Sequence, residues 1–283
     1  MIKNSSRGLM GDEWAQRDID RADKLLNVAK SNLFRMSDNV LNLATDCLRK
    51  TRLATLLVNN EVHEAEGAAD IQLAAKAFAA YFQLAQHPEV DQTILLPGCS
   101  QVVHNGVGII ENGRVFPERW QEAYYTAVVA RDKVSMDSLA AFPIDILRSS
   151  ATKSIEAEYV LVEVLQSLHF KRDTFIPLIN KASELAVADG SDKALDITMG
   201  KIELLLALAT NLGLDFNETL EKNLVSHIGF YEAHQEDDVA PVESYIPMEL
   251  LGMAVQWFDA GNDLTVESDY LPKYCIEGTL FGV

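Results

Sequence analysis

Residues 117–170 contain the pattern that most constrains how this chain can fold: amphipathic helices interrupted by a proline. Trp120 and Tyr124 lie four positions apart with alanines nearby, so one side of a helix is broadly apolar. Pro143 cannot continue a helix, so we expect a new short helix after it and then a longer amphipathic one. Core packing is the expected role of Trp120 and Tyr124, while Tyr125, one position further round, is a candidate for exposure. The segment predicts helices packed on helices.

In most of the rest of the chain, apolar residues also recur at the spacing of an α-helix. This spacing, together with residues typical of helix ends, predicts further helices over residues 12–30, 33–58, 62–87, 174–188, 191–212, 216–234 and 245–259. Residues 88–116 break this period, and Asn112-Gly113 predicts a small β-hairpin between residues 107–110 and 114–116. The tail after Asn262 is expected to pack back on the body as an extended segment.

These elements predict an all-α fold, an irregular bundle of about ten helices with one small β-hairpin insertion. Low glycine (15) and proline (8) contents disfavour an all-β chain. No sharp change of composition divides the sequence, so we expect a single domain over residues 1–283. A soft joint at residues 88–116 would separate an N-terminal three-helix part from a larger C-terminal part.

The charge of the chain is strongly negative and unevenly distributed. The 42 acidic and 24 basic residues give a net charge of −18, which disfavours nucleic acid and anionic membranes as partners. From residue 189 onward there are 18 acidic and 4 basic residues. Solubility is one explanation of this excess. The other is that the C-terminal third presents an acidic face to a basic partner, and both stay open.

Sequence motifs for chemistry are missing. No apolar run approaches the roughly 20 residues that span a bilayer, and the first residues lack a signal-peptide pattern, so a cytoplasmic location is expected. Cys47, Cys99 and Cys275 form no CxxC pair, and no HExxH, GxSxG or phosphate-loop pattern occurs. We therefore expect no catalytic residue, no metal and no cofactor, and a binding protein rather than an enzyme.

Two sets of residues are candidates for binding a partner. The first is the acidic C-terminal set: Glu232, Glu236, Asp237, Asp238, Glu243, Asp259, Asp263, Glu267 and Asp269. The second is the tip of the predicted hairpin, with Glu111 and Arg114, although a loop of this length can equally be a plain connector.

The central block resembles the immunity protein 49 family of bacterial polymorphic-toxin systems. The resemblance lies in RWQEAYYTAVVARDKVSMDSLAAFPIDILRSS followed by EYVLVEVLQSLHF, and it extends to AAKAFAAYF upstream and VESDYLPKYCIEG in the tail. It covers about residues 68–278, whereas the first 60 residues have no clear counterpart. It implies an all-α, cytoplasmic, non-enzymatic protein that binds and neutralises a toxin domain, often of the nuclease type.

The leading hypothesis is an immunity protein, or antitoxin, whose acidic surface occludes a basic toxin domain. Two alternatives come from other classes: a helical hydrolase with a carboxylate-based site, and a generic helical scaffold that binds another partner. The apolar tail residues Leu280, Phe281 and Val283 can pack internally or across a homodimer.

Overall fold

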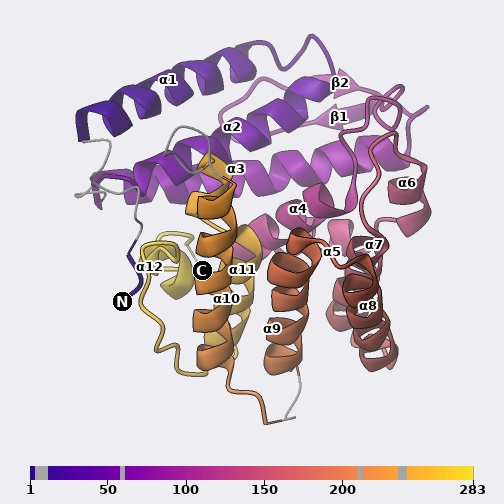
Figure 1. Cartoon of the computed structure of the whole chain (residues 1–283). Coiled ribbons are helices and arrows are strands. Elements are labelled where there is room, and N and C mark those ends of the chain that lie inside the picture. Colours follow the sequence, from indigo (N-terminus) through magenta and orange to yellow (C-terminus); the bar gives the residue numbers. More distant parts are fainter. Residues whose placement is uncertain (4–11, 58–60, 210–212, 235–240, 283) are drawn as a thin grey trace.

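Three helices at the start of the chain form one layer of the molecule. In a computed structural model, residues 1–3, 12–57, 61–209, 213–234 and 241–282 are described. Helices α1 (Asp12–Ser31), α2 (Asp38–Ala54) and α3 (Glu61–Gln86) lie across one side of the molecule (Figure 1). The predicted all-α fold is confirmed, with twelve α-helices within the described ranges.

The remaining helices lie beneath this layer, most of them steeply inclined to it (Figure 1). They are α4 (Pro117–Val129), α5 (Lys133–Ala140), α6 (Ile144–Ser149), α7 (Glu156–His169), α8 (Phe175–Asp189), α9 (Met199–Ala209), α10 (Phe216–Ala233), α11 (Met248–Asp259) and α12 (Lys273–Glu277). A π-helical turn, η1 (Lys193–Thr198), precedes α9, and a 3₁₀ turn, η2 (Val242–Tyr245), precedes α11. One apolar cluster includes residues of both layers, such as Leu41 of α2 and Leu251 of α11. The single-domain organisation itself stays a prediction.

A two-stranded hairpin is present, but not where the sequence pattern placed it. Strands β1 (Gln92–Ile94) and β2 (Val102–His104) pair antiparallel, with Thr93 opposite Val103. The prediction of strands around Asn112-Gly113 is wrong, because residues 107–113 form turns. The Asn112 amide donates to both carboxylate oxygens of Asp38, at 2.8 and 3.0 Å, which fixes this loop against the start of α2.

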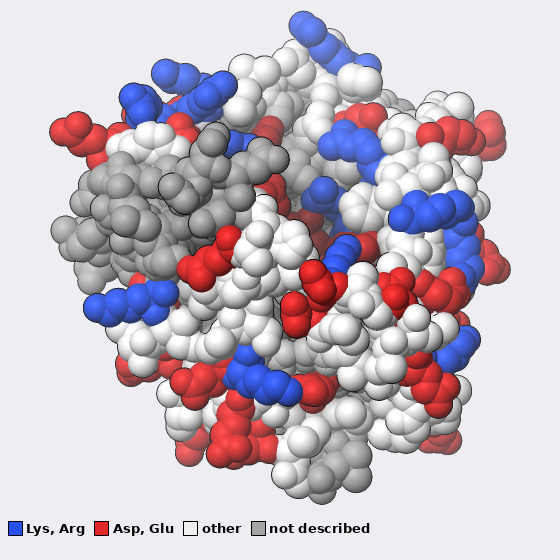
Figure 2. All heavy atoms as spheres, viewed as in Figure 1, with Lys and Arg blue, Asp and Glu red and all other residues white. Residues whose placement is uncertain are grey.

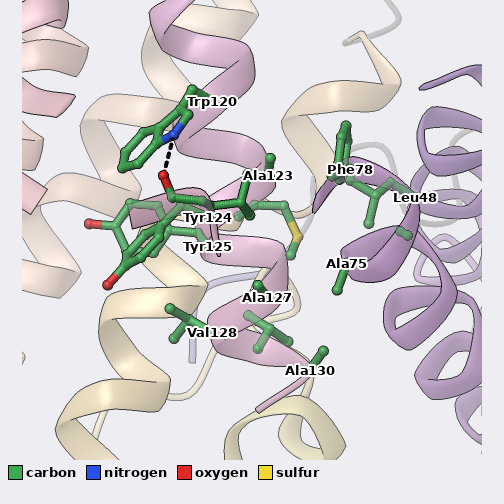
Figure 3. Packing of buried hydrophobic residues seen from close by; sticks show 14 of the residues in the cluster. Leu48, Ala75, Phe78, Trp120, Ala123, Tyr124, Tyr125, Ala127, Val128 and Ala130 are labelled. Carbon is green, nitrogen blue, oxygen red and sulfur yellow. Dashed lines mark hydrogen bonds between the residues drawn. The ribbon is translucent and has the colours of Figure 1, made fainter. Parts of the chain in front are cut away.

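Helix α4 is buried on nearly all sides and organises the core. The rings of Trp120 and Tyr124 stack with centroids 5.3 Å apart, and Trp120 Nε1 donates to the carbonyl of Leu139 at 2.9 Å (Figure 3). Tyr125 is buried as well, so its expected exposure is wrong. The reason is Gly252 on α11, where a Cβ would lie 2.3 Å from Tyr125 Cδ1. The missing side chain lets the tyrosine ring pack directly on the α11 backbone.

The C-terminal tail contains a short helix that periodicity did not predict. Helix α12 follows Pro272 and ends at Gly278, whose φ of 68° is left-handed. Phe281 is buried against the body, while Leu280 is 41% exposed and Val283 lies outside the described residues. The tail therefore packs back on the body, as expected, but as a helix and turns rather than an extended segment.

Candidate functional site

Two adjoining cavities form a cleft where α2, α4, η1, α9, α10 and α11 meet, which we call the charged cleft. Their volumes are about 140 and 230 Å³, and both are lined by Glu118, His227, Tyr231, Pro247 and Glu249. The smaller is further lined by Lys193, Asp196, Ile197, Lys201, Asn223 and Leu250, and the larger by Thr45, Arg49, Arg52, Phe116, Arg119, Glu122, Val242 and Glu243. Figure 2 shows a hollow on one face with basic and acidic side chains around it.

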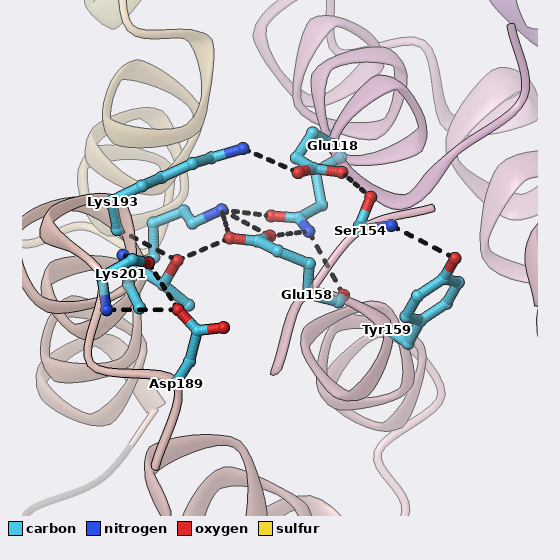
Figure 4. A network of polar contacts seen from close by, with 11 residues as sticks. Glu118, Ser154, Glu158, Tyr159, Asp189, Lys193 and Lys201 are labelled. Atoms are coloured by element: carbon cyan, nitrogen blue, oxygen red, sulfur yellow. Dashed lines mark hydrogen bonds and ion pairs between the residues drawn. The ribbon is translucent and has the colours of Figure 1, made fainter. Parts of the chain in front are cut away.

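A fully buried ion pair lies behind this cleft. Lys201 Nζ on α9 lies 2.8 and 3.0 Å from the two carboxylate oxygens of Glu158 on α7, and 2.9 Å from Gln121 Oε1 (Figure 4). The Thr198 hydroxyl donates to Glu158 at 2.7 Å. Burial raises the pKa of Glu158, but the Lys201 charge and the hydrogen bonds outweigh it and leave that pKa below its ordinary value. This network joins α4, α7, η1 and α9.

A second ion-paired group joins α2 to α4. Arg52 Nη2 lies 3.0 Å from Glu122 Oε1, and the Arg119 guanidinium binds the other carboxylate oxygen. Arg52 Nε also donates to the carbonyl of Ile246 at 3.3 Å, just before α11. Burial opposes ionisation of Glu122, but the two arginines prevail and lower its pKa. Glu122 is therefore a paired carboxylate.

Glu249 and His227 have shifted pKa values of a different kind. Burial raises the pKa of Glu249, and the nearby Lys201 charge offsets it only in part. Burial also lowers the pKa of His227 to about 4, so its imidazole is neutral near pH 7. Its Nε2 faces the carbonyl of Ser244 at 3.0 Å and therefore carries the proton. Perturbed ionisable groups gathered in a cleft are typical of functional sites.

A separate groove lies beside the C-terminal tail, which we call the acidic tail groove. Its volume is about 580 Å³. Four carboxylates line it against one lysine: Glu64, Glu267, Asp269 and Glu277 with Lys273. Its apolar lining comes from Met1, Phe258, Leu264, Val266, Leu271, Pro272 and Ile276. The groove thus joins apolar contact area to an excess of negative charge.

The structure separates the acidic residues proposed from the sequence. Glu267 and Asp269 line the acidic tail groove, whereas Glu243 lines the charged cleft. Asp263 is exposed, and its carbonyl accepts hydrogen bonds from Trp257 Nε1 and the Asn217 amide.

Two other members of the set lie elsewhere. Asp259 pairs with Arg131, and Glu232 is exposed at the end of α10. Glu236, Asp237 and Asp238 lie outside the described residues.

The loop with Glu111 and Arg114 is not a protruding hairpin tip. Arg114 Nη2 donates to Asn42 Oδ1 on α2 at 2.8 Å, so its side chain packs along that helix. Glu111 is exposed in the turn beside it. The two residues do not join the acidic set at either groove.

The sequence reasoning missed the charged cleft, although a signal for it existed. Glu158 stands within the apolar run of α7 and Glu249 within that of α11, where the helical period predicts buried positions. Charged residues at such positions are buried only with partners. The sequence did not show which cations would be those partners.

A chain of hydrogen bonds elsewhere joins a tyrosine, a histidine and an aspartate. Tyr124 Oη lies 3.1 Å from His169 Nδ1, and His169 Nε2 lies 2.9 Å from Asp137 Oδ1. This arrangement is not an open nucleophile site, because Tyr124 is only 2% exposed and its hydroxyl is covered by packing. Its role is to orient side chains between α4, α5 and α7.

Across the described ranges, no group of three or more His, Cys, Asp or Glu side chains is placed to hold a metal ion. In those same ranges, no helix is long and apolar enough to span a membrane.

The described residues thus define an all-α protein with two lined grooves and a buried ion pair between its helices. The chain belongs to the immunity protein 49 family, whose family model matches residues 59–275. The chain matches neither a curated protein nor a solved structure. Family membership supports an immunity function and a toxin as the partner.

Proposed function

We propose that this protein neutralises a cognate toxin by covering a basic, nuclease-type toxin domain with its acidic C-terminal surface. The observation that carries the proposal is the acidic tail groove, where Glu267 and Asp269 stand beside an apolar lining. The family supplies the immunity role. Non-enzymatic binding in the cytoplasm follows from the same proposal.

In this proposal, charge speeds the association of the two proteins, and apolar contact area stabilises the complex. Opposite charges steer two proteins together and can raise association rates by about 10–10³-fold at low salt. Apolar residues such as Phe258, which is 37% exposed, and Leu264 then supply contact area that loses water on binding. An anionic cover over a nuclease also competes with its phosphate substrate for the same basic residues.

Charge reversal in the groove tests this proposal. Glu267→Lys in the groove, combined with Asp263→Lys next to its lining residue Leu264, is expected to lower the association rate for the cognate toxin domain by about tenfold at low salt, and less at high salt. The matched control is Glu184→Lys combined with Asp192→Lys, which alters two exposed acidic residues at α8 and just beyond it. Equal effects of the two pairs would show that total charge, rather than this groove, governs binding.

The charged cleft favours one second candidate, a hydrolase with a carboxylate-based site. Such enzymes hold two carboxyl groups at different pKa values, as Glu249 and Glu122 are held here. Incubation of the wild type and Glu249→Gln with panels of glycoside, ester and phosphoester substrates tests it. Turnover by the wild type that the variant lacks would establish it, and absence of turnover by both leaves toxin binding as the function.

A further inference from the structure

Glu249 is a carboxylate in the charged cleft without a cation of its own. Within the ranges that the structure describes, no lysine or arginine nitrogen lies within 4.0 Å of its carboxylate. By contrast, Glu118 has Lys193 at 2.8 Å, and Glu122 has Arg52 at 3.0 Å. Among the carboxylates in the interior of the cleft, Glu118 and Glu122 are therefore neutralised by bound cations, and Glu249 is not.

The cations nearest to Glu249 are already engaged. The three hydrogens of the Lys201 ammonium are directed to Gln121 Oε1 and to both oxygens of Glu158, at 2.8–3.0 Å. Arg52 is held by Glu122 and by the carbonyl of Ile246. Neither side chain can turn to Glu249 without breaking these buried bonds.

The space beside Glu249 is large enough for more than water. The smaller cavity has a volume of about 140 Å³, whereas a single water needs roughly 10–15 Å³. Asn223 and Tyr231 also line it. The end of an extended side chain fits this volume together with a few waters.

The mouth of the cleft, like its interior at Glu249, carries negative charge. Asp196 and Glu243 are exposed there, and no ion pair joins either to another described residue. Of the cations that line the cleft, Arg49 is exposed and has no carboxylate of a described residue within 4.0 Å. Two carboxylates against one guanidinium favour the entry of a cation.

We propose that the charged cleft receives one guanidinium or ammonium side chain of the bound partner, with Glu249 as its counter-ion. The inference rests on the proposed function, since the partner is the toxin that this protein neutralises. A charged hydrogen bond inside such a cleft is stronger than one in bulk water because the surrounding dielectric is lower. The cleft thus adds a specific anchor to the attraction of the acidic tail groove.

Protonation of Glu249 gives this site a pH dependence. Burial holds the pKa of Glu249 above its ordinary value, and an incoming cation favours the ionised form. The charged and titratable groups around it come from every element of the cleft: Arg49 and Arg52 on α2, Glu118, Arg119, Glu122 and Tyr125 on α4, Lys193 and Asp196 in η1, Lys201 on α9, His227 and Tyr231 on α10, and Glu243 in η2. Cation binding should therefore weaken as the pH falls towards 5.

A small cation tests the site without any toxin. N-acetyl-argininamide is titrated into protein carrying ¹³C-labelled tyrosine rings, and the Tyr231 signal is assigned with Tyr231→Phe. We expect a saturable shift of this signal at millimolar probe. N-acetyl-citrullinamide, which has the same shape without the charge, should bind at least about tenfold more weakly. Glu249→Gln should remove the preference, and Glu267→Gln in the acidic tail groove should keep it.

The pH dependence of the wild type gives a second measurement that needs no variant. A carboxyl of ordinary pKa, about 4.3, stays mostly ionised at pH 5, so its titration would weaken argininamide binding by only about 1.2-fold between pH 7.5 and 5. Because burial raises the pKa of Glu249, a larger loss of affinity is expected here. Equal binding of both probes, no binding, or binding of N-acetyl-aspartate instead would each overturn the inference. These outcomes leave the proposed function intact, because that function is tested separately by charge reversal in the acidic tail groove.

Discussion

The guanidinium of Arg131 lies 2.9 Å from the carboxylate of Asp259, although 128 positions separate the two residues. Arg131 also donates to the carbonyls of Cys275 at 2.9 Å and Ile276 at 2.7 Å. It therefore ties the corner between α4 and α5 to the end of α11 and to α12. This pairing gives Arg131 a structural role and leaves Asp259 less available to a partner.

Replacing Arg131 should destabilise the fold. Arg131→Ala removes the side-chain donors of three backbone carbonyls, those of Val129, Cys275 and Ile276, and is expected to lower the free energy of unfolding by about 2–3 kcal/mol. Urea denaturation measures the change. Arg17→Ala, at an exposed position of α1, is the control and should change stability by less than about 0.5 kcal/mol. A similar small change for both variants would contradict the structural role of Arg131.

Two helical glycines should respond to alanine in opposite directions. At Gly252 on α11 a new Cβ would collide with Tyr125, so Gly252→Ala should cost about 1–3 kcal/mol of stability. At Gly229 on α10 no atom lies within 4 Å of the added Cβ, so Gly229→Ala should stabilise by about 0.5–1 kcal/mol. Thermal and urea unfolding of both variants measure the signs. A Gly252→Ala variant as stable as the wild type would contradict the packing of Tyr125 on α11.

Acid should destabilise the protein through His227. Its folded pKa of about 4 lies below the ordinary value of 6.5, so between these values the unfolded chain binds the proton and the native state does not. Stability from this group is present above pH 6.5 and is lost as the pH falls towards 4.

The His227 contribution can be measured where carboxylates stay ionised. Between pH 6.5 and 5 the wild type should lose about 1.5 kcal/mol more than His227→Gln, which keeps a donor for the Ser244 carbonyl. The same pH dependence in both proteins would place the acid sensitivity elsewhere.

The buried pair of Lys201 and Glu158 should show strong coupling. Lys201→Met leaves Glu158, whose side chain is 0% exposed, without its counter-charge and should cost about 3–5 kcal/mol. Adding Glu158→Leu should recover part of that loss, because it removes the uncompensated buried charge. A double-mutant cycle from urea unfolding measures the coupling. Additive losses in the cycle would show that the two side chains act independently.

The sequence by itself determined most of the helices, because the spacing of apolar residues and the residues that begin or end a helix are local features. Asp215 caps α10 through the amide of Glu218 at 2.9 Å, and Pro117 begins α4, both as their local patterns predict. Trp120 and Tyr124 lie in the core for the same reason. These features depend on residues only a few positions apart, and the helical backbone sets the relative positions of such residues.

Only the tertiary structure decided which residues from distant segments come into contact. Tyr125 is buried because Gly252 leaves it room, and Asn112-Gly113 stays a turn because Asp38 holds it, and neither partner is marked by local spacing. The charged cleft arises in the same way, since Glu249 acquires its surroundings from α2, α4, α9 and α10. Packing between helices brings together residues that are far apart in the sequence. The sequence therefore shows which residues are charged, while the fold determines which of them form ion pairs.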